Sequence, residues 1–263
     1  MTPTHYNLVL SLNYYRFEFL KYQVLNFKRN LSEFSCLVVL NVSSDDYQRA
    51  LETKAHMKDL IDVLVNPVCM ERKRYHGSLT KCVVENMKYV GELDIEYDYF
   101  VVLSNRSELR KKYEVIDFDN IIIQVRDKID LNQYKVAGIP FPYAFRNHLN
   151  RIERPRHHRK NGNHDDLKLW HWPLFSKTKL FQFFTERNSP CHGFPHEGLF
   201  FKSDVISRIV EFSESHVDIM MDLYEFEWCV EELFFGSVCG YLKQEFGFLD
   251  VYKFKFRKNR IIK

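Results

Sequence analysis

Along the first 125 residues, short apolar runs alternate with longer stretches in which apolar residues recur at helical spacing. Continuous apolar runs of about four to eight residues are typical of buried strands, and apolar residues three or four positions apart are typical of helices that bury one face. The pattern therefore predicts strands at 5–12, 36–42, 59–68 and 97–104, and helices at 14–31, 43–58 and 75–93.

This alternation of strands and helices predicts an α/β fold, with a mostly parallel central sheet and helices on both faces. In such sheets, ligands bind outside the carboxyl ends of the strands. Asn13, residues 41–44 and residues 104–106 lie at or just after the ends of three predicted strands. We therefore expect these three segments to line one crevice.

The pattern changes after residue 140. Residues 146–166 are polar, strongly basic and almost free of apolar side chains. We expect an exposed or mobile loop, for most of its length a solvated linker, with a lid over an anionic ligand as the alternative. Aromatic residues are again dense at 170–184, and residues 196–212 predict a strand that runs into a helix.

Composition limits the class of protein. With 263 residues, 45% of them hydrophobic, the chain can bury a large core, and a net charge of +3 gives no case for a nucleic-acid partner. No apolar run approaches the roughly 20 residues that span a bilayer, and the N-terminus lacks a signal-peptide pattern. The cysteines form no CxxC pair, which predicts reduced thiols in a soluble, cytoplasmic protein; they are Cys36, Cys69, Cys82, Cys191, Cys229 and Cys239.

Several common catalytic motifs are absent from the sequence. There is no GxGxxG or P-loop sequence for a nucleotide, and no GxSxG for a serine nucleophile. Cys191, His192 and His196 are the nearest approach to a zinc site, but they lack a matching second half. Carboxylates remain as the best candidates for catalysis, and Glu231 and Glu232 lie side by side within an aromatic and aliphatic run.

Four segments match one family in order along most of the chain. They are YHGSLTKCVVENMKYV at 75–90, YDYFVVLSNRSEL at 97–109, HEGLFF at 196–201 and EELFFGSV at 231–238. The sequence resembles the core-2/I-branching N-acetylglucosaminyltransferases and the peptide O-xylosyltransferases. The first segment is similar to that family's tryptophan-glycine-serine helix, the second to its WDYFINLS strand, and the last to its (D/A)E-x-(F/L)-(F/W) motif.

The resemblance implies a glycosyltransferase with a GT-A type fold in a single domain over 1–263. Residues 1–125 would form the nucleotide-sugar half, and residues 126–263 the acceptor and catalytic half. It also implies a UDP-sugar donor, a glycan acceptor, inversion at the anomeric carbon and no essential metal. UDP-xylose is the favoured donor because EELFF is closest to the xylosyltransferase form of the motif, and UDP-N-acetylglucosamine is second.

Alignment on the family motif selects Glu232 as the general base. In an inverting transfer, a hydroxyl attacks the sugar C1 and a base takes the hydroxyl proton. An apolar setting such as WCVEELFF would raise the pKa of a carboxyl toward neutrality. Glu231 would then be structural or solvent-facing, because neighbouring helical residues point about 100° apart. Without the resemblance, Glu232 would be interpreted as a salt-bridged helix carboxylate.

Fixed cations are expected to stabilise the leaving diphosphate in place of a metal. The family has basic residues near its C-terminus for this purpose, and Arg257 and Lys258 fit best, with Arg260 next. The alternating KFKF there predicts an ordered strand. Ser104, Asn105 and Arg106 offer a hydroxyl, an amide and a guanidinium but no carboxylate pair. Two acidic segments, 117–119 and 164–166, remain as alternatives for a metal-binding motif.

Further donor contacts are expected from Asn13, Asn41, Ser43 and Ser78, of which the serines are equally consistent with helix caps or turns. The family has an acidic residue near the position of Asn41, so this chain departs from the family there. On the acceptor side, Trp170 and Trp172 are candidates to stack on a sugar, although most aromatic residues here belong to the core. Glu197, followed by Gly198, is the candidate to bind acceptor hydroxyls.

A second function class stays open: a noncatalytic carbohydrate- or nucleotide-binding module on the same fold. The altered loop at 104–107 and Asn41 favour this alternative, and Glu232 and the basic C-terminus oppose it. Animal members of the family carry a membrane anchor and luminal disulfides, of which this sequence shows no sign. We therefore expect a microbial or viral version of the enzyme that acts in the cytoplasm.

Overall fold

The computed structural model describes most of the chain in separate segments, on which all structural statements below rest. They are residues 4–14, 20–32, 34–70, 77–104, 107–109, 134–138, 144–146, 151–153, 177–189, 191–192, 199–226, 231–242, 245–248 and 256–258.

A seven-stranded sheet forms the centre of the protein, in the order β11-β6-β10-β4-β1-β2-β3. Every strand runs in the same direction except β10, which is antiparallel to both β4 and β6. The prediction of a mostly parallel sheet is confirmed. The bounds are β1 Thr4–Tyr14, β2 Cys36–Val42, β3 Asp62–Val65, β4 Ile95–Ser104, β6 Tyr134–Gly138, β10 Leu199–Lys202 and β11 Glu245–Phe248.

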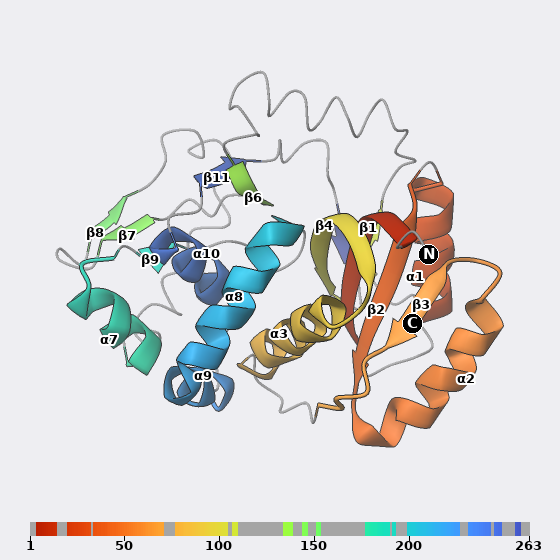
Figure 1. Ribbon diagram of the computed structural model, residues 1–263, viewed down its shortest axis with the longest axis horizontal. Helices are drawn as coiled ribbons and strands as arrows, with labels where there is room; N and C mark the ends of the chain where they lie inside the picture. Colours follow the sequence, from red (N-terminus) through yellow and green to blue (C-terminus); the bar gives the residue numbers. More distant parts are fainter. Residues whose placement is uncertain are drawn as a thin grey trace.

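Helices cover both faces of this sheet, as predicted for an α/β fold (Figure 1). On one face, α1 (Leu20–Asn30) and α2 (Tyr47–Met57) pack apolar side chains such as Phe27 on the even-numbered leucines and valines of β1 and β2. A larger core on the other face joins the remaining helices. These are α3 Gly77–Gly91, α7 Lys179–Glu186, α8 Ser203–Ser215, α9 Val217–Tyr224 and α10 Glu231–Tyr241.

The sequence predicted most of these elements, but two predictions need correction. The third strand is shorter than 59–68, because the Leu60 backbone N–H donates to the Met57 carbonyl and residues 59–61 close the end of α2. The basic segment 146–166 is not loop throughout. Its residues 151–153 form β8 (Arg151–Glu153), the outer strand of a small sheet with β7 (Ala144–Arg146) and β9 (Cys191–His192). Charged side chains are common on such edge strands.

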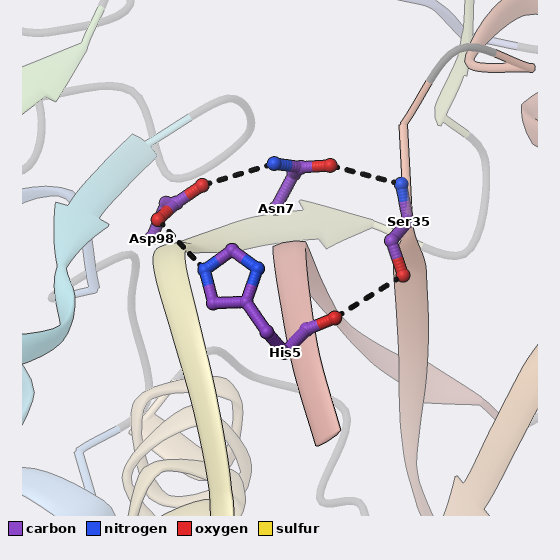
Figure 2. A network of polar contacts seen from close by, with 4 residues as sticks. All are labelled: His5, Asn7, Ser35 and Asp98. Atoms are coloured by element: carbon purple, nitrogen blue, oxygen red, sulfur yellow. Dashed lines mark hydrogen bonds and ion pairs between the residues drawn. The ribbon is translucent and has the colours of Figure 1, made fainter. Parts of the chain in front are cut away.

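A polar network ties the strands together at the edge where they begin, called here the amino edge (Figure 2). The Asp98 carboxylate accepts a hydrogen bond from the Asn7 side-chain amide at 3.1 Å and lies 3.1 Å from His5 Nε2. The Asn7 side-chain oxygen accepts from the Ser35 backbone N–H at 3.0 Å, and the Ser35 hydroxyl donates to the His5 backbone carbonyl at 3.4 Å. Polar groups at this edge therefore satisfy one another.

Candidate functional site

Three strand ends meet in one row at the opposite edge, called here the carboxyl edge. In the register of the sheet, Asn13 of β1 lies opposite Asn41 of β2 on one side and opposite Ser104 of β4 on the other. The three strand ends are therefore adjacent, as predicted, and the crevice that they were expected to line stays a prediction. This is the edge at which open α/β sheets bind their ligands.

The side-chain amides of Asn13 and Asn41 are buried without full hydrogen bonding. Asn13 is 3% exposed, and within the described part of the chain neither its amide nitrogen nor its amide oxygen has a hydrogen-bond partner. Asn41 is 1% exposed and donates to the Val68 carbonyl at 3.1 Å, while its own oxygen has no partner. Each buried group left unsatisfied costs about 1–3 kcal/mol, so such groups are rare outside functional sites.

Strand alternation explains why these amides point into the protein. Val9 of β1 and Val39 of β2 belong to the core beneath α3, and side chains two residues apart point to the same face. Asn13 and Asn41 follow on that face. They are the next-to-last residues of β1 and β2, so the sequence places polar groups where the apolar face ends.

A satisfied polar network lies one step further from the carboxyl edge. The Asn86 amide of α3 donates to the Ser11 hydroxyl at 3.0 Å and to the Val39 carbonyl at 3.4 Å. The Asn66 amide donates to the Asn86 side-chain oxygen and to the Glu85 carbonyl, each at 3.0 Å. The network fixes α3 to β1, to β2 and to the segment that follows β3.

Sequence reasoning missed Asn66 and Asn86. A signal was present, because Asn86 interrupts the apolar face formed by Val83, Met87 and Val90, and asparagine is unfavourable inside a helix unless its side chain has a specific partner.

The two serine candidates occupy local turn or helix-start positions. The Ser43 hydroxyl donates to the Asp46 carboxylate at 3.1 Å, and Ser43 precedes the short 3-10 turn Ser44–Asp46. Ser78 is buried in the first turn of α3. In the same turn, the buried Thr80 hydroxyl has no hydrogen-bond partner among the described residues. The contact that Ser43 makes is that of a turn residue, which is the alternative raised from the sequence.

Glu231 and Glu232 are the first two residues of α10. Leu233, Phe234 and Phe235, which follow directly, are buried in the core beneath α3. The first turn of a helix stabilises negative charge because its backbone N–H groups are unpaired and aligned.

A short strand includes two of the C-terminal basic residues, whereas residues 253–255 of the predicted strand lie outside the described residues. β12 (Phe256–Lys258) pairs antiparallel with β5 (Ser107–Leu109), and the register sets Arg257 opposite Glu108 and Lys258 opposite Ser107. Ser107 follows Ser104 by only three residues. The pairing therefore brings the basic end of the chain next to the segment that leaves β4 at the carboxyl edge.

Several candidates lie outside the described residues: Asn105, Arg106, Arg260, Trp170, Trp172, Glu197, Gly198 and the acidic segments 117–119 and 164–166. Among the residues that the structure does describe, no three His, Cys, Asp or Glu side chains gather so as to hold a metal ion. No helix in those segments is long and apolar enough to cross a membrane. Cys36, Cys69 and Cys239 are free thiols, and burial raises the pKa of the Cys36 thiol to about 12.

Comparisons with known proteins add little to these structural findings. No family model matches the sequence, and no curated protein matches it. Among solved structures, the crystal structure of TarS from S. aureus, a glycosyltransferase, aligns with a TM-score of 0.33 and 14% sequence identity. The alignment covers 51% of this chain and 21% of TarS, so about half of this chain aligns with about a fifth of that protein. A likeness of this degree defines no activity.

Proposed function

We propose that this protein is a glycosyltransferase of the GT-A type that moves a sugar from a UDP-sugar to a hydroxyl of a glycan acceptor. The proposed reaction is inverting and independent of a metal ion, with UDP-xylose as the first donor and UDP-N-acetylglucosamine as the second. The proposal combines the polar row at the carboxyl edge with the family resemblance of the four sequence segments.

The observation that carries the proposal is the pair of buried, incompletely bonded amides of Asn13 and Asn41. At the amino edge, by contrast, Asp98, Asn7 and Ser35 use their hydrogen bonds on one another. Unsatisfied groups at one edge, and satisfied groups at the other, support ligand binding at the carboxyl edge. An amide can both donate and accept, which suits the hydroxyl and carbonyl groups of a nucleoside.

The proposed chemistry assigns one role to each charged group. The acceptor oxygen attacks C1 of the sugar, the bond from C1 to the diphosphate oxygen breaks, and the hydroxyl proton passes to the carboxylate of Glu232. Arg257 and Lys258 stabilise the charge that develops on the diphosphate. Glu232 is the second residue of α10 and directly precedes the buried Leu233 and Phe234.

The test is a panel of UDP- and GDP-sugars incubated with the purified protein and EDTA, with and without simple sugar acceptors. Release of UDP from UDP-xylose or UDP-N-acetylglucosamine alone is the expected result. Activity that EDTA abolishes and Mn²⁺ restores would refute metal independence. Stereochemical inversion is checked by the anomeric configuration of the product.

The alternative is a noncatalytic nucleotide- or carbohydrate-binding module. Asn41 favours it, because an amide held by the Val68 carbonyl stands near the place where the family has an acidic residue. A module of this kind would show a thermal shift with UDP but no UDP release from any donor. Silence in both measurements would refute both functions.

A further inference from the structure

The start of α3 makes an unusually close backbone contact with the end of α9. A side-chain carbon added at Gly77 would lie 2.4 Å from the Leu223 carbonyl oxygen, 2.7 Å from that of Tyr224 and 2.9 Å from that of Phe226. The Gly77 backbone N–H also donates to the Phe226 carbonyl at 3.3 Å. Only glycine fits this position without movement of the backbone around it.

Side chains reinforce this contact along the next turns of α3. The Lys81 ammonium lies 5.6 Å from the centre of the Tyr224 ring. Burial raises the pKa of Tyr224, and the nearby Glu85 and Cys82 of α3 raise it further. The chain just after α9 is therefore held by the Phe226 carbonyl, and the last residue of α9 by its side chain.

The other half of α3 is fixed to the sheet. Asn86 bonds to Ser11 and to the Val39 carbonyl, one step from the row of Asn13 and Asn41. The segment after α9 leads, within five residues of Phe226, to Glu231 at the start of α10. α3 thus contacts the strands of the polar row as well as α9 and α10, the helix that begins with the two glutamates.

We propose that Gly77 is a positioning residue. Because glycine has no side chain, α3 can lie close to the end of α9, and this contact fixes the position of α10 relative to the polar row of Asn13 and Asn41. The role in catalysis rests on the proposed function, whereas the role in placing α10 does not. An alanine at 77 would force the Leu223 carbonyl back by about 1 Å to reach ordinary contact at 3.4 Å. A misplacement of about 1 Å at a reacting group can cost on the order of 10²-fold in rate.

The test compares Gly77→Ala with Gly91→Ala in the full chain. Gly91 ends the same helix, and a carbon added there would meet nothing within 4 Å. We expect faster backbone hydrogen exchange over 217–226 and 231–242 in Gly77→Ala, and kcat lower by roughly 10²-fold with UDP binding unchanged. Gly91→Ala should match the wild type in every measurement.

Tyr224→Leu provides a second variant in case Gly77→Ala does not fold, since it loosens the same contact without adding a clash. It should also raise exchange over 231–242 and lower kcat. Equal exchange in Gly77→Ala and Gly91→Ala would overturn the proposal, as would raised exchange with an unchanged kcat. Should the wild type release no UDP from any donor, the proposed function fails, and hydrogen exchange alone decides whether Gly77 places α10.

Discussion

Asn13 and Asn41 lie opposite each other in the parallel register of β1 and β2, both buried, and no hydrogen bond joins their side chains. Burial without a hydrogen-bond partner is unfavourable for an amide. Apolar side chains precede both residues on the same face, so a position that served only the core would be expected to carry an apolar residue as well. Under the proposed function, the stability given up at this row is the cost of binding the donor there.

Asn13→Leu tests that relationship. The substitution removes an unsatisfied amide and keeps a similar shape, so we expect the free energy of unfolding to stay constant or to rise by about 1–2 kcal/mol, while UDP binding weakens. Chemical denaturation and calorimetry of UDP binding measure the two effects. Asn86→Leu is the matched control. It breaks hydrogen bonds to Ser11 and Asn66 and should lower stability by about 1–3 kcal/mol. Equal losses in both variants would contradict this interpretation of Asn13.

Glu232→Gln should abolish most transfer without loss of donor binding. The amide keeps the shape of the side chain but cannot take a proton, and removal of a general base typically costs roughly 10²–10⁴-fold in rate. Steady-state kcat and a thermal shift with UDP separate the two effects. Glu231→Gln, at the neighbouring position of α10, is the control and should retain most activity. If Glu232→Gln keeps a normal rate, the base lies elsewhere.

Arg257→Gln and Lys258→Gln should weaken donor binding, because each removes a cation expected at the diphosphate. Hydrogen bonds to charged groups contribute about 1.5–3 kcal/mol, so KM for the donor should rise by roughly tenfold or more per variant. The salt dependence of donor binding should also decrease. Lys58→Gln, at the exposed end of α2, changes the net charge equally and should leave KM unaltered. A loss shared by Lys58→Gln would indicate a general effect of charge.

Tyr6 should make the protein lose stability at alkaline pH. Burial, and then the hydrogen bond of its hydroxyl to Asp62 at 3.0 Å, raise the pKa of Tyr6 from 10.0 to about 12. A pKa raised on folding contributes stability that is fully present below pH 10 and is lost as the pH rises toward 12. Denaturation at several pH values from 9 upward should show a shallower decline for Tyr6→Phe than for the wild type. Parallel declines would exclude Tyr6 as a cause.

Most of the fold that could be predicted from the sequence followed from local patterns of apolar residues. The buried strand Cys36–Val42 was predicted with its final bounds because a continuous apolar run leaves few other interpretations. The third predicted strand was too long, since an apolar run such as Leu60–Ile61 can also complete the end of a helix. Boundaries of this kind depend on which backbone group accepts a hydrogen bond, and composition does not reveal that.

The candidate site was predictable only in part. Asn13, Asn41 and Ser104 follow from the rule that parallel strands end at one edge. The pairing of β5 with β12 joins residues about 150 positions apart, and three-residue strands carry too little pattern to reveal a partner. Gly77 belongs to one of the four segments that carry the family resemblance. Glycine is required there because of the carbonyl oxygens at and just after the end of α9, which no local sequence pattern reveals.

The reversed direction of β10 has a topological consequence. After a strand that is parallel to its neighbours, one helix returns the chain to the amino edge. α3 does so before β4 begins at Ile95. β10 runs the other way and enters α8 directly at Ser203, so α8 and the following α9 return the chain to the opposite edge, where Phe226 meets Gly77. One reversed strand thus changes which edge of the sheet the chain reaches after the helices that follow it. It brings residues from the last third of the chain to the same edge as residues from its first third, with no long crossover.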